Sequence, residues 1–299
     1  MSAERQGAGG PHPAPSTQHP APDYLVVGHV TKDLVPGGFV LGGTVAFASL
    51  TAHRLGRSAA VLTRGAWLPG LAARFDGVAF HLLPAEVTTT FENVYTPAGR
   101  VQHLRAAAPA IPAAAVPAAW RAAGVVHLGP VAQEVPPELA EAFPDATLVG
   151  VTPQGWLRTW DASGLVRPAP WDNAERVLAR ADVLVFSAED VGGDLALVRR
   201  YAELARLAVV TDHRNGCTVW YQGRQEHHPA FEVDEVDPTG AGDVFAAAFL
   251  LRYGETRDSA EAARFANCVA SFVVEGRGTA VLPTQQQVEQ RLKTGRYRR

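Results

Sequence analysis

The sequence predicts a doubly wound α/β fold, in which helices cover both faces of a mostly parallel sheet. The first observation is a series of short runs rich in Val and Leu, which suit strands buried on both faces. The second is that helix-like segments separate many of these runs, as in parallel strands joined by crossover helices. The third is that 299 residues, 47% of them apolar, can enclose a sizeable core.

The predicted strands and helices alternate through most of the chain. The strands are Tyr24–Gly28, Ala59–Thr63, Gly124–Leu128, Thr147–Val151, Val183–Phe186 and Leu207–Thr211. The helices are Thr44–Leu55, Glu138–Phe143, Asn173–Ala179 and Asp194–Ala205. We expect one domain over residues 23–292, since no internal repeat is visible. Residues 1–22 are rich in Ala, Pro, Gly, Ser and His and predict a disordered arm, and residues 293–299 predict a solvated basic tail.

Composition and charge exclude several classes of protein. The formal net charge of −3 gives no reason to expect nucleic acid or an anionic membrane as a partner. No apolar run is long enough to span a bilayer or to form a signal peptide. Cys217 and Cys268 are the only cysteines, which argues against a disulfide framework and structural zinc and fits a cytoplasmic location.

One region departs from the alternating pattern. From Thr88 to Ala106, two β-prone stretches flank a Pro/Gly turn, which predicts a hairpin. A hairpin inserted in a parallel α/β domain needs a surface to cover. The alternative is a surface excursion without a role.

The most informative segment is Val236–Asp243, which leads into an apolar helix. Its sequence is Val-Asp-Pro-Thr-Gly-Ala-Gly-Asp, so a glycine turn opens the helix and ends on a carboxylate. Amides at a helix N-terminus attract an anion such as a phosphate, and an aspartate there can accept a proton from an attacking hydroxyl. The alternative interpretation is an ordinary capped helix start.

Asp-Pro-Thr-Gly-Ala-Gly-Asp followed by an apolar helix resembles the C-terminal signature of the ribokinase (phosphofructokinase-B type) carbohydrate kinases. The resemblance implies a ribokinase-like fold and transfer of a phosphoryl group from ATP, with Mg²⁺, to a small sugar or polyol. It also implies that the hairpin contributes a small β lid over the substrate, at about residues 88–106. It implies that Asp243 is the catalytic base and that the amides of Gly240, Ala241 and Gly242 form the anion hole, with Thr239 beside the donor. It leaves open a dependence on a monovalent cation, and the protein as monomer or as homodimer through the lid.

The N-terminal part of the chain carries the predicted acceptor site. Asp33 follows the first strand by five residues and stands at the carboxyl end of the sheet, where ligands of open α/β folds gather. In the resembling kinases this carboxylate binds substrate hydroxyls, and the di-glycine Gly42-Gly43 lets the backbone approach the sugar. A turn aspartate is the alternative for Asp33.

Three further residues indicate a subgroup within the resembling family. Phe47 stands where sugar kinases usually carry an Asn, and a phenyl ring cannot donate to a hydroxyl. Together with Glu92 in Thr-Thr-Phe-Glu and Gln154 after a strand, it makes the chain more similar to plant-type myo-inositol kinases. These three positions are therefore predicted acceptor contacts.

The donor half matches the family less closely. Asp190, with Glu189 as its rival, takes the place of the family's magnesium-organising Glu, although Ser187-Ala188-Glu189-Asp190 also matches a capping box. The predicted nucleotide contacts are Thr211, His213, Arg214, Gly216, Asn267 and Gly278, and His213 replaces the family's first glycine of this loop.

The absence of three well-known motifs argues against other classes of enzyme. The sequence holds no Gly-x-x-x-x-Gly-Lys-Ser/Thr loop, no dinucleotide-binding Gly-x-Gly-x-x-Gly after the first strand and no Gly-x-Ser-x-Gly elbow. A second hypothesis remains, in which the chain is a binding or regulatory protein that keeps the kinase fold. Phe47 and His213 motivate it, and the intact Gly-Ala-Gly-Asp argues against it.

Overall fold

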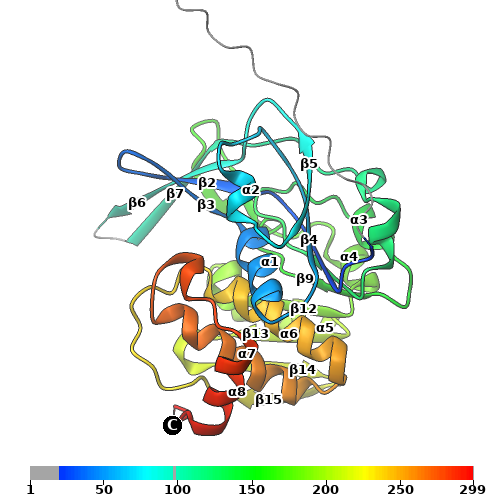
Figure 1. The fold of residues 1–299 in the computed structure, drawn as a ribbon, viewed down its shortest axis with the longest axis vertical. Coiled ribbons are helices and arrows are strands. Elements are labelled where there is room, and N and C mark those ends of the chain that lie inside the picture. The colour runs from blue at the N-terminus through cyan, green and yellow to red at the C-terminus, as the bar shows by residue number, and fades with distance from the viewer. Residues whose placement is uncertain (1–19, 97–98, 299) are drawn as a thin grey trace, which may run out of the picture.

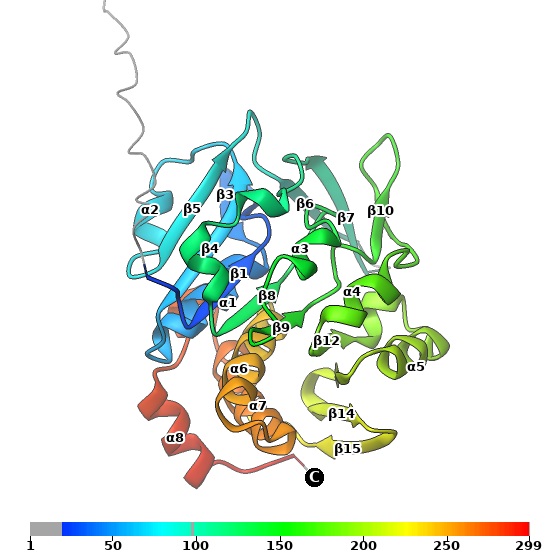
Figure 2. The same ribbon diagram turned by 90° about the vertical axis from the view of Figure 1, so that its right-hand side faces the viewer.

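The computed structural model describes residues 20–96 and 99–298, and its centre is a nine-stranded sheet. The strand order is β15-β14-β13-β12-β9-β8-β1-β4-β5 (Figures 1 and 2). The parallel strands are β1 (Tyr24–Val27), β4 (Ala59–Gly65), β5 (Ala79–Pro84), β8 (Val125–Leu128), β9 (Leu148–Val151), β12 (Val183–Ser187) and β13 (Leu207–Thr211). This confirms the predicted doubly wound α/β fold, while most of the predicted arm lies outside the described residues.

Two strands at one edge pair antiparallel with their neighbours, β14 with β13 and β15 with β14. They are β14 (Cys217–Tyr221) and β15 (Arg224–His228), and neither was predicted. β15 reads Arg-Gln-Glu-His-His and is exposed except at its last residue, so it lacks the apolar run of a buried strand. An edge strand can be polar because only one of its sides is paired.

Helices cover both faces of the sheet. On one face lie α1 (Thr44–Arg54), α2 (Leu71–Arg74), α6 (Ala241–Thr256), α7 (Ser259–Val274) and α8 (Gln285–Thr294). On the other lie α3 (Glu138–Glu141), α4 (Ala174–Arg180), α5 (Leu195–Leu204) and the short helices η1 (Ala113–Ala115) and η2 (Ala118–Ala122) (Figure 2). Alternate residues of β1 enter the two cores, with Tyr24 in the first and Leu25 in the second. None of the helices in the described part of the chain is long and apolar enough to cross a bilayer.

The lid is a separate four-stranded sheet in the order β3-β2-β6-β7. The predicted hairpin forms β6 (Thr90–Thr96) and β7 (Gly99–Ala106). β2 (Thr31–Val35) and β3 (Gly38–Gly42) complete it, with β2 parallel to β6, and the sheet projects from the body in Figure 1. A second small hairpin, β10 (Arg158–Trp160) and β11 (Val166–Pro168), lies nearby. The lid therefore uses the segment that carries Asp33, which the hairpin signal alone did not show.

The C-terminal segment is ordered through its backbone. Residues 293–294 belong to α8, and the chain then pairs with residues 230–232 instead of lying free in solvent. The amide of Glu232 donates to the carbonyl of Arg296 at 2.8 Å, and the amide of Arg298 donates to the carbonyl of Ala230 at 2.8 Å. The side chains of residues 293–297 are exposed, as expected of a solvated tail, while the backbone of residues 296 and 298 pairs with the neighbouring loop.

Candidate active site

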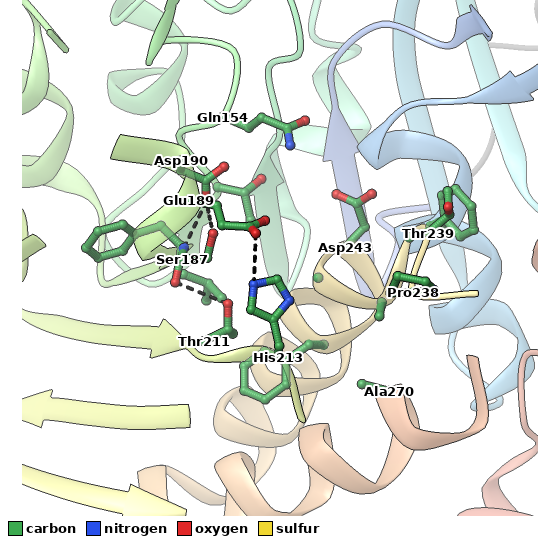
Figure 3. Close-up of a pocket in the computed structure, with 18 of the residues that line it drawn as sticks. Gln154, Ser187, Glu189, Asp190, Thr211, His213, Pro238, Thr239, Asp243 and Ala270 are labelled. Atoms are coloured by element: carbon green, nitrogen blue, oxygen red, sulfur yellow. Dashed lines mark hydrogen bonds and ion pairs between the residues drawn. The ribbon is translucent and has the colours of Figure 1, made fainter. Parts of the chain in front are cut away.

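A cavity of about 1060 Å³ opens between the lid, the carboxyl ends of the central strands and the N-terminus of α6 (Figure 3). The predicted residues that line it are Asp33, Gly43, Phe47, Gln154, Glu189, Asp190, Thr211, His213, Arg214, Gly216, Thr239, Gly240, Ala241, Gly242, Asp243 and Asn267. Gly42, Glu92 and Gly278 do not line it. The structure thus brings most of the predicted acceptor and donor residues to one site.

Asp243 lies in the first turn of α6 with its carboxylate at the cavity wall. The hydroxyl of Thr44, the first residue of α1, donates to Asp243 Oδ1 at 2.8 Å. Burial raises the pKa of the Asp243 carboxyl to about 6, and the Thr44 hydrogen bond opposes that rise. The negative charges of Asp190 and Asp33 raise this pKa further, while the positive charge of Arg158 lowers it. The site therefore holds a carboxylate that is a better base than an exposed aspartate.

The turn before α6 depends on a close contact between Gly240 and Phe47. Gly240 has a φ of 81°, and a β-carbon there would lie 2.3 Å from the Phe47 ring. Phe47 is 7% exposed, and its buried ring packs beneath the turn at Gly240. Because the Ala241 amide donates to the Pro238 carbonyl at 3.1 Å, the amide of Gly242 is the one of this pair left to face the cavity.

The structure explains why glycine stands at both positions of the predicted acceptor signature, Gly42 and Gly43. A β-carbon on Gly42 would lie 2.2 Å from Asp33 Oδ2, so this glycine makes room for the carboxylate. Gly43 has a φ of 89°, and a β-carbon there would lie 2.5 Å from the carbonyl oxygen of His29. Only Gly43 lines the cavity, and Gly42 acts by admitting Asp33.

Glu92 does not take the predicted position. It lies on the lid face opposite the cavity, where it forms an ion pair with Arg105. Its neighbour Asn93 lines the cavity instead and accepts a hydrogen bond from Gln102 at 3.0 Å. In a strand adjacent residues point to opposite faces, so a site facing Asn93 excludes Glu92.

The acidic residues at the donor end have local partners. Asp190 Oδ2 accepts from the Ser187 amide at 2.8 Å and the Ser187 hydroxyl at 3.0 Å, which is the capping box that the sequence left open. Glu189 forms an ion pair with His213 at 3.2 Å (Figure 3). Within residues 20–96 and 99–298, no three His, Cys, Asp or Glu side chains are grouped to hold a metal ion.

A comparison with known families matches the C-terminal part of the chain. Residues 172–286 match the family model described as pfkB family carbohydrate kinase, and this match includes the Asp243 turn and the donor half of the cavity. The C-terminal part of the chain, residues 172–286, is therefore similar to the pfkB family carbohydrate kinases.

Individual relatives agree with this assignment. Inositol 3-kinase of Zea mays is 29% identical over 258 residues, which cover 77% of this chain and 66% of that enzyme. Ribokinase of Bacillus subtilis (strain 168) is 38% identical over 84 residues, which cover 28% of this chain and 29% of that enzyme. The chain thus spans less than two thirds of each of these relatives.

Solved structures show the same fold. A pyrophosphate-dependent kinase in the ribokinase family superposes with a TM-score of 0.75, 24% identity and coverage of 89% of this chain and 99% of that one. Ribokinase of Arabidopsis thaliana complexed with ribose and ATP gives a TM-score of 0.69 at 21% identity, covering 91% and 99%. Both likenesses show that the chain has the ribokinase-like fold.

Two of the predicted nucleotide contacts have structural roles. Gly216 has a φ of 100°, and a β-carbon there would lie 2.1 Å from the carbonyl oxygen of His228. Asn267 is 5% exposed, and its side-chain amide donates to the carbonyls of His228 at 3.0 Å and Pro229 at 3.3 Å. Both residues fix the chain after β15 against the rest of the donor end.

The sequence reasoning missed Arg158 and Glu134. Arg158 lines the cavity and is the cation that lowers the pKa of Asp243, and its position four residues after Gln154 was the available signal. The buried carboxylate of Glu134 accepts from the amides of His29 at 2.8 Å and Ala132 at 2.7 Å. It joins the loops after β1 and β8, and no local pattern indicates such a long-range partner.

A buried polar chain supports the cavity floor. The Tyr24 hydroxyl lies 2.7 Å from His127 Nδ1, and His127 Nε2 lies 3.0 Å from the Thr152 hydroxyl, which reaches the cavity. Burial lowers the pKa of His127 to about 3, so the ring is neutral and donates through one nitrogen while accepting at the other. This chain fixes the orientation of Thr152 beside the acceptor end.

Proposed function

We propose that the chain transfers the terminal phosphoryl group of ATP to a hydroxyl of a sugar or cyclic polyol. The observation that carries the proposal is Asp243, a carboxylate with a raised pKa that Thr44 orients at the N-terminus of α6. In this proposal Asp33 binds acceptor hydroxyls and Asp243 accepts the proton of the attacking one. The amides of Gly240 and Gly242 and the guanidinium of Arg158 stabilise the charge that develops on the phosphoryl group, while the Ala241 amide is held by the Pro238 carbonyl.

Positioning supplies much of the expected rate enhancement. An aspartate remains a weak base toward an alcohol even with a pKa near 6, so proton transfer comes late and orientation matters most. Asp33 and Asp243 both line the cavity, and Asp33 lies near enough for its negative charge to raise the Asp243 pKa. This arrangement supports an attacking hydroxyl held between the two carboxylates.

Magnesium is the cofactor that this site would hold. The carboxylates of Asp190 and Glu189 face the cavity opposite Asp243 (Figure 3), and Mg²⁺ prefers oxygen ligands and retains part of its water shell. Asp190 uses Oδ2 for Ser187, so its other oxygen is the one available to a metal-bound water. Bound with ATP, the ion would neutralise phosphate charge during transfer.

A cyclic polyol such as myo-inositol is the acceptor that we favour. The relative described as inositol 3-kinase supports it, as do the polar side chains of Asn93, Gln102 and Gln154 on the acceptor walls. We expect ADP release with myo-inositol at saturating ATP to exceed that with ribose, fructose or adenosine in a coupled assay. A nucleoside or furanose far ahead of the polyol would reject this choice of acceptor.

The regulatory alternative makes a different prediction. A chain that keeps the fold without catalysis would release no ADP with any acceptor, and a failure to bind Mg·ATP at millimolar concentration in calorimetry would favour it. The raised pKa of Asp243 and its hydrogen bond from Thr44 support the enzyme, since a binding protein has no need for a basic carboxylate.

The assembly is either a monomer or a homodimer through the lid. Leu34, Val35, Phe39 and Val40 of β2 and β3 are each 38–49% exposed, which supports the homodimer.

The pH dependence of turnover follows from the Asp243 pKa. Because the base acts when deprotonated, kcat/KM should fall about tenfold per pH unit below an apparent pKa near 6 and level off above it. Replacing Thr44 by valine removes a hydrogen bond that favours the carboxylate, so this acidic limb should move to higher pH. Thr44→Ser keeps the hydroxyl and should retain the wild-type profile. An identical limb in Thr44→Val and Thr44→Ser would show that another group controls it.

A further inference from the structure

The C-terminal strap, which we define as residues 295–298, lies against the loop that follows β15. Backbone hydrogen bonds join Arg296 to Glu232 and Arg298 to Ala230. The Tyr297 ring packs on the Phe231 ring with a centroid distance of 4.5 Å, and the end of the chain lies beside β15 in Figure 2. The strap is therefore ordered and packs against residues 230–232 of this loop.

One end of the cavity has a different character from the catalytic end. Phe231 and Val233 line it from the loop after β15, and Ala270 and Val274 line it from α7. Such apolar walls suit a flat aromatic ring, whereas a phosphate chain requires amides and cations. The amides that suit a phosphate lie at the Gly240–Gly242 turn, so this end is placed to receive the base of a nucleotide donor.

Arg298 brings a cation to this apolar end. Its side chain lines the cavity, and its Nη2 donates to the Val233 carbonyl at 3.1 Å. Its Nε is buried without a hydrogen-bond partner among the residues that the structure describes. A guanidinium is planar, stacks on aromatic rings and donates to ring nitrogens, so a purine can occupy the space beside it.

We propose that Arg298 contacts the base of the donor and makes the site select a nucleoside triphosphate over an inorganic phosphoryl donor. The proposal rests on the proposed kinase function and adds the element that distinguishes its donor. A pyrophosphate or tripolyphosphate has no group to place between Phe231, α7 and the strap, so it gains nothing from this wall. Donor selection then depends on the four residues of the C-terminal strap, which the catalytic signature does not include.

Calorimetry with two donors tests the proposal. Mg·ATP and Mg·tripolyphosphate carry the same phosphate chain, and only the first carries a base. We expect Arg298→Ala to raise the Kd of Mg·ATP about tenfold and to leave that of Mg·tripolyphosphate unchanged, since one lost contact of this size is worth about a factor of ten. The matched control is Arg296→Ala, which removes the same charge from the same strap at an exposed side chain outside the cavity and should change neither Kd.

Two results would overturn the proposal. Unchanged Mg·ATP affinity in Arg298→Ala, with an unchanged melting temperature, would show that Arg298 does not contact the donor. Equal weakening of both donors, or the same loss in Arg296→Ala, would show a general charge effect. Activity separates this proposal from the kinase function. Phosphoryl transfer from ATP with an Mg·ATP affinity that does not depend on Arg298 rejects only the base contact, and Arg298-dependent ATP binding without transfer to any acceptor rejects only the kinase function.

Discussion

Replacing Asp243 by asparagine should lower kcat by about 10³-fold, the contribution expected of a positioned general base. Asparagine has the same shape, and its amide oxygen can still accept the hydrogen bond from Thr44 that now ends on Asp243 Oδ1. The free energy of unfolding should therefore stay within about 0.5 kcal/mol of the wild type. A coupled ADP-release assay and thermal unfolding measure the two quantities.

The matched control for this variant is Glu235→Gln. Glu235 also lines the cavity, and its replacement removes the same negative charge away from the Gly240–Gly242 turn. Turnover in this variant should stay within a few-fold of the wild type. If Asp243→Asn kept a near-normal kcat, or if Glu235→Gln lost as much, Asp243 would not be the base.

The variants Gly240→Ala and Gly242→Ala should distinguish two requirements of the turn. Gly240 is needed for the backbone conformation of the turn, and Gly242 leaves room for the phosphoryl group in the cavity. Alanine at Gly240 must adopt a φ of 81° and meets the Phe47 ring at 2.3 Å, so we expect a loss of about 2 kcal/mol or more of unfolding free energy. A β-carbon at Gly242 meets no atom within 4 Å, so Gly242→Ala should keep its stability or gain up to about 1 kcal/mol in the helix.

Activity should fall in both variants for different reasons. In Gly240→Ala the turn itself is displaced, whereas in Gly242→Ala a methyl group projects toward the space where we place the phosphoryl group. Adding Phe47→Ala to Gly240→Ala makes room for the new methyl group, so the two stability losses should sum to more than the loss in the double variant. A fully active Gly242→Ala, or strictly additive losses for Gly240 and Phe47, would contradict this picture of the turn.

The sequence predicted the central sheet because its strands are buried on both faces and leave continuous apolar runs. The same signal is absent from β15, which is polar and exposed, and from β2, where Lys32 and Asp33 interrupt the pattern. The hairpin signal over residues 88–106 was correct, but it did not specify which face of the strand points inward. A one-residue change of that face exchanges Glu92 for Asn93.

Within the site, local motifs were easier to predict than long-range partners. The residues of the Asp243 turn are contiguous in sequence, so their chemical role could be predicted from the motif. The structure places the turn in the same cavity as Asp33. Glu134 meets the His29 amide across 105 positions of the chain, and Arg298 reaches the donor end only through the fold. The role of Phe47 also required the structure, because its contact with Gly240 joins α1 to the turn of α6.

The central claim is that this cavity transfers a phosphoryl group to a hydroxyl, and phosphorus NMR of the product tests it most directly. The wild-type chain is incubated with Mg·ATP and each of myo-inositol, ribose, fructose and adenosine, with Asp243→Asn in parallel. We predict a new phosphomonoester resonance with stoichiometric ADP for at least one acceptor, myo-inositol above all, and no such resonance with the variant. Folded wild-type chain that binds Mg·ATP yet forms no phosphomonoester with any of these acceptors would contradict the account.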